Sequence, residues 1–117
     1  MEAGYKIQLD FFSGLQNPSF EITREDFVDI YKEVTMLEKA EAALFFDGLG
    51  FRGLILSEAN STFIYIQNKI IKIETSNEEK YFKSNPDIIL KAINLFKSYD
   101  QENSFEMLIE KAIAEYL

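Results

Sequence analysis

The chain has 117 residues, which is enough for one domain with its own hydrophobic core. It contains neither Cys nor His, so disulfides, thiolate chemistry and zinc sites built from sulfur or imidazole are excluded. With 20 acidic and 12 basic residues its net charge is −8, which predicts repulsion of nucleic acid and anionic membranes and attraction of a basic protein partner.

The first 23 residues contain two strand-like stretches. Apolar and polar residues alternate over residues 5–11 and again over 19–23, which is the period of a half-buried strand. The sequence SGLQNP between them is longer than a tight hairpin needs. We therefore predict two short antiparallel strands joined by an ordered loop.

A long helix is predicted to follow. Thr23 precedes Asp26 by three residues, a spacing that caps free backbone amides and predicts a helix beginning at Arg24. Apolar residues then recur at helical spacing as far as Leu44. Gly48 in the sequence FFDGLG is the expected end of this helix.

The middle of the chain has the pattern of an antiparallel meander. The stretches FRGLILS, TFIYIQ and IIKIET are rich in β-branched and aromatic residues and are separated by EANS and NK, which suit turns. The next stretch, EEKYFK at 78–83, is either an edge strand or an irregular lead into a helix, and the strand is the favoured interpretation.

Two helices are predicted at the C-terminal end. Asn85 followed by Pro86 is a helix start signal, and Ser104 is the expected cap of a last helix. The whole chain, residues 1–117, is thus predicted to be a single α+β domain in the order ββαβββαα. We expect an antiparallel sheet of about five strands, with the long helix and the C-terminal helix pair packed against it.

Two glycine-containing motifs resemble those of a family of small bacterial proteins, in which they usually read F-S-G-R-P-N-P and L-G-Y-R-G. The matching residues are Phe12, Ser13, Gly14, Asn17, Pro18 and Phe20, followed by Leu49, Gly50, Phe51, Arg52 and Gly53. The departures are Leu15 and Gln16 in place of Arg-Pro, and Phe51 in place of Tyr. The resemblance extends to the meander and the helix pair, and it implies no particular activity.

The first motif has a structural and a functional interpretation. Gly14 permits a positive φ, Asn17 tolerates left-handed geometry and Pro18 restricts the residue before it, so the loop can be ordered without a ligand. Alternatively, the ordered loop presents Ser13, Leu15, Gln16 and Asn17 to a partner.

The second motif, GLGFRG, lacks the G-x-x-x-x-G-K-[ST] pattern and the following helix of a phosphate-binding loop. Its first glycines, including Gly50, are expected to end the long helix, and Gly53 to allow close packing. We expect Arg52 to hydrogen-bond loop carbonyls or to pair with a carboxylate such as Asp10.

No known catalytic pattern is present. Without His or Cys, a general base would have to be a carboxylate or a lysine, and the chain contains neither G-x-S-x-G nor S-x-x-K nor a D-x-D-x-D-G calcium loop. We therefore expect a protein that is not an enzyme and that needs no metal and no cofactor.

The functional hypothesis is a small acidic cytoplasmic protein that binds a larger, basic protein, most specifically an immunity protein that neutralises a bacterial toxin. The expected contact residues are Glu25, Asp29 and Glu33 of the helix, with Gln16 and Asn17 of the loop. The alternative is a small-ligand-binding or regulatory module with a pocket beside Phe12, Phe20 and Phe51. A monomer and a homodimer formed through an exposed sheet edge are both compatible with the sequence.

Overall fold

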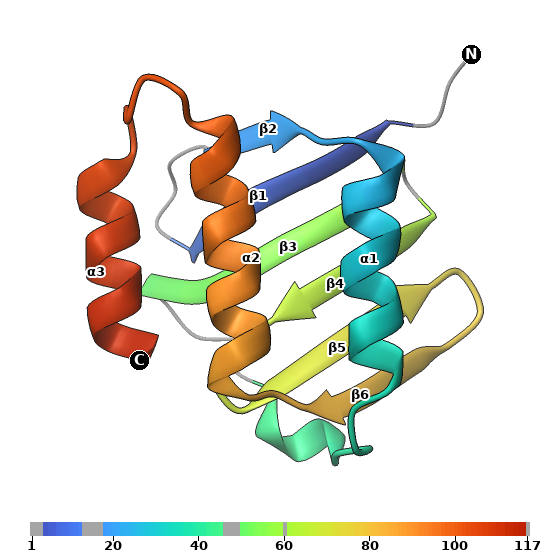
Figure 1. Ribbon diagram of the computed structural model, residues 1–117. Helices are drawn as coiled ribbons and strands as arrows, with labels where there is room; N and C mark the ends of the chain where they lie inside the picture. Colours follow the sequence, from blue (N-terminus) through green and yellow to red (C-terminus); the bar gives the residue numbers. More distant parts are fainter. Residues whose placement is uncertain (1–3, 13–17, 46–49, 60, 117) are drawn as a thin grey trace.

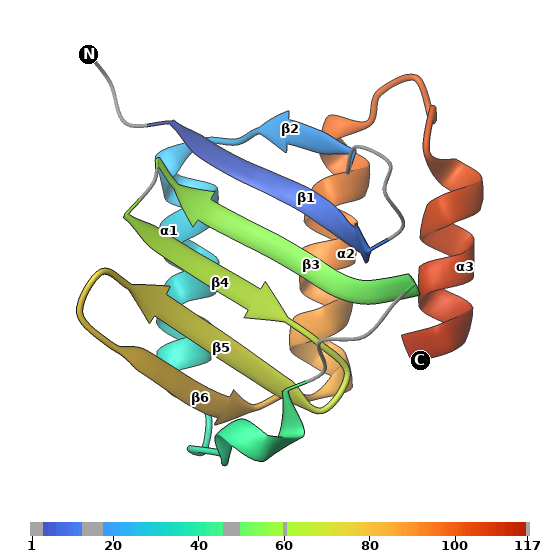
Figure 2. The same cartoon turned by 180° about the vertical axis from the view of Figure 1, so that it is seen from behind.

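The computed structural model describes residues 4–12, 18–45, 50–59 and 61–116. Over these residues the chain forms a six-stranded antiparallel sheet with three α-helices on one face (Figures 1 and 2). The predicted α+β class is confirmed, with six strands where about five were expected. The segment that the sequence left ambiguous, 78–83, supplies the sixth strand.

The strands follow the alternating patterns of the sequence. They are β1 (Tyr5–Phe12), β2 (Ser19–Glu21), β3 (Gly50–Glu58), β4 (Thr62–Ile66), β5 (Ile70–Thr75) and β6 (Glu79–Lys83). Their order in the sheet is β2-β1-β3-β4-β5-β6, and every neighbouring pair is antiparallel. The connection from β2 to β3 through the first helix places β3 beside β1.

The helices are α1 (Arg24–Thr35), α2 (Pro86–Tyr99) and α3 (Glu106–Tyr116), with a short 3-10 turn, η1 (Ala42–Leu44), between α1 and β3. Figure 1 shows α1 and α2 side by side across the sheet and α3 beside α2. The view from behind in Figure 2 shows the opposite face of the sheet without a helix over it.

The core lies between the sheet and this helical layer. Alternate strand residues such as Ile7, Leu56 and Ile64 are fully buried against helix residues such as Val34 and Phe96. Each aliphatic side chain buried in this way contributes roughly 1.5–3 kcal/mol relative to an exposed one. This burial fixes which side of each helix faces solvent.

Two predicted helix starts are confirmed. The Asp26 backbone N–H donates to Thr23 Oγ1 at 3.1 Å, and the Ile88 N–H donates to Asn85 Oδ1 at 2.9 Å. Pro86 occupies the first residue of α2, where a missing N–H costs nothing. Local sequence is therefore sufficient to begin both helices.

The predicted length of the first helix is wrong, because α1 ends at Thr35. The residues that follow leave the helix and pair with the sheet: the Ala40 N–H donates to the Tyr81 carbonyl at 2.9 Å, and the Lys83 N–H donates to the Glu38 carbonyl at 2.7 Å. The backbone of 38–40 is thus used to cover the outer edge of β6. Gly48, the expected helix end, lies outside the described residues.

The predicted cap of the last helix is also corrected. The carboxylate of Asp100 accepts the backbone N–H groups of Ser104 and Phe105, each at 2.9 Å. Asp100 is 4% exposed and is also the C-cap of α2, where its own backbone N–H donates to carbonyls of the last helical turn. One buried carboxylate, rather than the Ser104 hydroxyl, therefore connects α2 to α3.

Close packing at Gly53 is confirmed. Gly53 has φ of +128°, and a Cβ atom there would lie 2.0 Å from the Ile66 carbonyl oxygen. Pairing with β1 shifts at this point, since Asp10 lies opposite Gly53 and Phe11 opposite Phe51, which leaves Arg52 as the extra residue of a β-bulge. Gly50 begins β3 and so does not end a helix.

Candidate functional site

The acidic side of α1 carries three of the five expected contact residues. The opposite side of this helix buries Phe27 and Ile30 against the core. Glu25, Asp29 and Glu33 therefore project from the exposed surface of the helical layer. Two of these carboxylates prove to be held in place by a residue from another helix.

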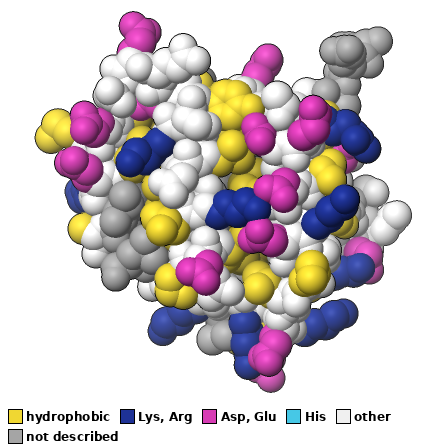
Figure 3. Space-filling view, in the orientation of Figure 1, with side chains coloured by type: hydrophobic (Ala, Val, Ile, Leu, Met, Phe, Trp, Pro, Cys, Tyr) yellow, Lys and Arg dark blue, Asp and Glu magenta, His cyan; other side chains and the backbone are white. Residues whose placement is uncertain are grey.

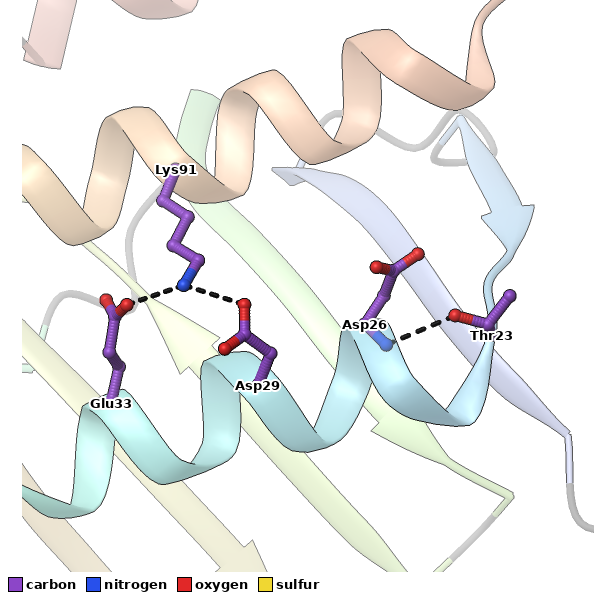
Figure 4. Close-up of polar contacts among 5 residues, drawn as sticks. All are labelled: Thr23, Asp26, Asp29, Glu33 and Lys91. Carbon is purple, nitrogen blue, oxygen red and sulfur yellow. Dashed lines mark hydrogen bonds and ion pairs between the residues drawn. The ribbon is translucent and has the colours of Figure 1, made fainter.

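Lys91 of α2 bridges the two carboxylates (Figure 4). Its Nζ lies 2.7 Å from Asp29 Oδ2 and 2.5 Å from Glu33 Oε1. The Asp29 and Glu33 side chains are nevertheless 64% and 49% exposed. The hydrogen bonds from Lys91 to Asp29 and then to Glu33 raise the pKa of Lys91, against partial burial, which lowers it. The cluster is a fixed, exposed group with one net negative charge.

A second link joins the same two helices near the start of α1. The Tyr99 hydroxyl donates to Asp26 Oδ2 at 2.6 Å and accepts the Thr23 backbone N–H at 3.1 Å. The Asp26 carboxylate is thus already hydrogen-bonded to a residue of its own chain. Glu25, one residue earlier, makes no ion pair with any other residue that the structure describes.

Charge over the helical layer is mixed. Figure 3 shows acidic side chains interspersed with Lys and Arg, and apolar side chains between the helices. The surface therefore combines acidic groups with apolar contact area. It is not an uninterrupted acidic patch.

The remaining sequence-predicted residues are only partly described. Ser13, Gly14, Gln16 and Asn17 lie outside the described residues, whereas the Pro18 carbonyl accepts the Leu9 N–H at 3.0 Å. The structure describes the backbone of Arg52, which belongs to β3, but not its side chain. The expected pairing of Arg52 with Asp10 therefore stays a prediction.

Of the pocket expected beside Phe12, Phe20 and Phe51, the structure describes only the Phe20 side chain. The Phe20 ring is partly buried and packs against the core, with its centre 5.1 Å from that of Phe96 and 5.9 Å from that of Phe105. The side chains of Phe12 and Phe51 lie outside the described residues.

Sequence reasoning missed Lys91 and Tyr99. Both belong to α2, and both act on α1 residues more than fifty positions away. The available signal for Lys91 was a single charged residue within the mainly apolar stretch IILKAINLF. Its partners could not be named without knowing which helix lies beside α2.

The helix-free face of the sheet carries a second polar cluster. Lys72 Nζ lies 4.2 Å from the centre of the Phe45 ring, 4.6 Å from that of Tyr65 and 3.3 Å from Glu74 Oε1. On the next strand, partial burial and a hydrogen bond to Glu79 raise the pKa of the Tyr81 hydroxyl. Lys72 is therefore already engaged by aromatic rings and a carboxylate of its own chain.

Over residues 4–12, 18–45, 50–59 and 61–116, no three carboxylates gather in a way that could hold a metal ion. None of the helices in these ranges has the length and apolar character needed to cross a membrane. Comparison with family models, with curated proteins and with solved structures gives no match to this chain.

Proposed function

We propose that this protein is a small non-catalytic binding module that blocks a larger protein with a basic surface, in its most specific form an immunity protein that neutralises a bacterial toxin. The observation that carries the proposal is the exposed acidic side of α1, where Glu25, Asp29 and Glu33 are available to solvent. The motif resemblance to a family of small bacterial proteins is compatible with this role.

The fixed geometry of Asp29 and Glu33 favours binding. Ordering a long side chain at an interface costs about 0.5–1.5 kcal/mol, and here Lys91 has already ordered both carboxylates. A partner Lys or Arg can use the carboxylate oxygens that Lys91 leaves exposed. Gln16 and Asn17 are the other expected contacts of this proposal, and they lie outside the described residues.

The overall charge of the chain supports fast association. A net charge of −8 attracts a basic protein over a distance set by the ionic strength, about 8 Å at physiological salt. Binding should therefore weaken as salt rises. Such a binder needs no metal, no cofactor and no catalytic group, and it would act in the cytoplasm, where it protects the producing cell.

The direct test is to express a tagged copy in the native host and identify the protein that it retains at low salt. We expect a larger basic protein, encoded beside this gene, that kills cells when expressed alone and is rescued by co-expression. A partner that is absent at low salt, together with failure of co-expression to rescue killing, rejects the proposal.

The contact surface is tested with Glu25→Lys, because Glu25 makes no ion pair within the described chain and its replacement leaves the Lys91 cluster intact. The variant should lower the association rate about tenfold or more. Glu102→Lys is the matched control, since Glu102 is exposed in the turn between α2 and α3. Equal effects of the two variants would assign the attraction to net charge rather than to α1.

A further inference from the structure

A pocket of about 230 Å³ opens at the start of α1, between this helix, β1 and the turn from β3 to β4. Its walls include Tyr5, Arg24, Phe27, Tyr31, Glu58 and Thr62. Pockets for drug-sized ligands usually measure about 300–1,000 Å³, so this one suits a smaller molecule. It combines one cation, one carboxylate and aromatic rings within a small volume.

The two charged residues meet at one phenol. Tyr5 donates its hydroxyl hydrogen to Glu58 Oε2 at 3.0 Å, and the positive charge of Arg24 acts on the same hydroxyl. Partial burial and the hydrogen bond to Glu58 raise the pKa of Tyr5, whereas Arg24 lowers it. Arg24 and Glu58 do not form an ion pair with each other in the described part of the chain.

The pairing of these charges fits a zwitterion. Arg24 and Glu58 both line this pocket of about 230 Å³. A molecule that carries an ammonium and a carboxylate on one carbon can therefore reach Glu58 with the first and Arg24 with the second. Arg24 keeps donors for this purpose, because a guanidinium has five N–H groups.

Arg24 is also in an unusual position for a structural residue. It is the first residue of α1, where the helix dipole disfavours a positive charge by about 0.3–1 kcal/mol. A bound carboxylate would be attracted both by Arg24 and by this end of the helix. A bound carboxylate would therefore offset the unfavourable interaction between Arg24 and the helix dipole.

The apolar wall consists of aromatic rings. The Phe27 ring lies 5.3 Å from that of Tyr5 and 6.2 Å from that of Tyr31, with which it is stacked. Phe27 is buried, whereas Tyr5 and Tyr31 are partly exposed and present ring surface to the pocket. This surface would receive an apolar or aromatic side chain of the ligand.

We propose that this pocket binds a free α-amino acid with an apolar or aromatic side chain, its carboxylate on Arg24, its ammonium on Glu58 and its side chain against Tyr5 and Tyr31. The site is independent of the proposed protein partner, because the acidic side of α1 is formed by other residues of that helix. Binding or its failure therefore leaves the partner proposal unaffected.

The test is calorimetric titration of the purified protein with three probes: L-phenylalanine, phenethylamine, which lacks the carboxylate, and 3-phenylpropionate, which lacks the ammonium. We expect L-phenylalanine to bind at least about tenfold more tightly than either, since each missing charge removes a charge-assisted hydrogen bond. No detectable binding of L-phenylalanine, or equal binding of all three probes, overturns the proposal.

Two variants test whether Arg24 binds the carboxylate and Glu58 binds the ammonium. Arg24→Gln should remove the advantage of L-phenylalanine over phenethylamine. Glu58→Gln should remove its advantage over 3-phenylpropionate, while the amide oxygen of the new side chain can still accept the Tyr5 hydroxyl hydrogen. Lys32→Gln, on an exposed position of the same helix, is the control and should change neither ratio. Thermal melts show whether each variant is folded, and the probe comparison on the unaltered protein needs no variant.

Discussion

At Gly53 the main chain of β3 approaches β4 too closely for any side chain. Gly53→Ala would place a methyl group 2.0 Å from a backbone oxygen at a φ of +128°. We expect a loss of about 3 kcal/mol or more in the free energy of unfolding, because a strained backbone and an overpacked contact each cost about 1–3 kcal/mol. Urea denaturation monitored by circular dichroism measures it.

Gly4→Ala is the matched control for Gly53. Apart from its chain neighbours, no described residue has an atom within 4 Å of a Cβ built at Gly4, so the substitution should leave the free energy of unfolding nearly unchanged. If the two variants unfold at the same urea concentration, the close approach of β3 and β4 is not a constraint on this fold.

On the scale of elements, the junction between α2 and α3 depends on Asp100. Asp100→Ala removes the acceptor of two backbone N–H groups and should destabilise the protein by about 1–2 kcal/mol. Asp100→Asn keeps one acceptor oxygen and should be intermediate. Ser104→Ala should be nearly neutral in the same thermal melts, and a Ser104 effect as large as that of Asp100 would restore the serine as the cap.

The ion pairs that Lys91 of α2 makes with Asp29 and Glu33 of α1 should make the free energy of unfolding depend on pH. Because the folded-state pKa of Lys91 is raised above its ordinary value of 10.5, its ion pairs contribute fully below that pH and are lost as pH rises through the folded-state pKa. Lys91→Met should cost about 0.5–1 kcal/mol at neutral pH, as expected for an exposed ion-pair network. The difference from the unaltered protein should shrink above pH 10.5.

Urea denaturation of both proteins on either side of this pH measures the Lys91 effect. Lys111→Met is the control, because Lys111 is exposed on α3 and makes no ion pair in the described part of the chain. A Lys91 difference that stays constant with pH would mean that the ion pairs with Asp29 and Glu33 contribute nothing to stability.

On the scale of the whole molecule, both edges of the sheet offer little free backbone for pairing with another chain. The edge strand β6 is covered by residues 38–40, and the opposite edge strand β2 has three residues. We therefore expect a monomer of 13.6 kDa at micromolar concentration, because a second copy finds little free backbone with which to extend the sheet. Light scattering over a concentration series tests this, and a mass near twice that value would contradict it.

The sequence by itself determined the fold class, the strands and the starts of α1 and α2. These features depend on neighbouring residues: alternation marks a strand, and a capping side chain such as Thr23 or Asn85 reaches an amide three residues away. The exposed position of Glu25, Asp29 and Glu33 follows from the same local periodicity.

The tertiary structure decided the rest. Apolar spacing continues past Thr35, but α1 stops there because residues 38–40 bond to β6, some forty positions away. Lys91 reaches Glu33 across 58 positions, and the Tyr5 pocket is lined by residues of four separate elements, β1, α1, β3 and β4. Such contacts depend on which elements become neighbours, and that is set by packing of the common core rather than by any short stretch of the chain.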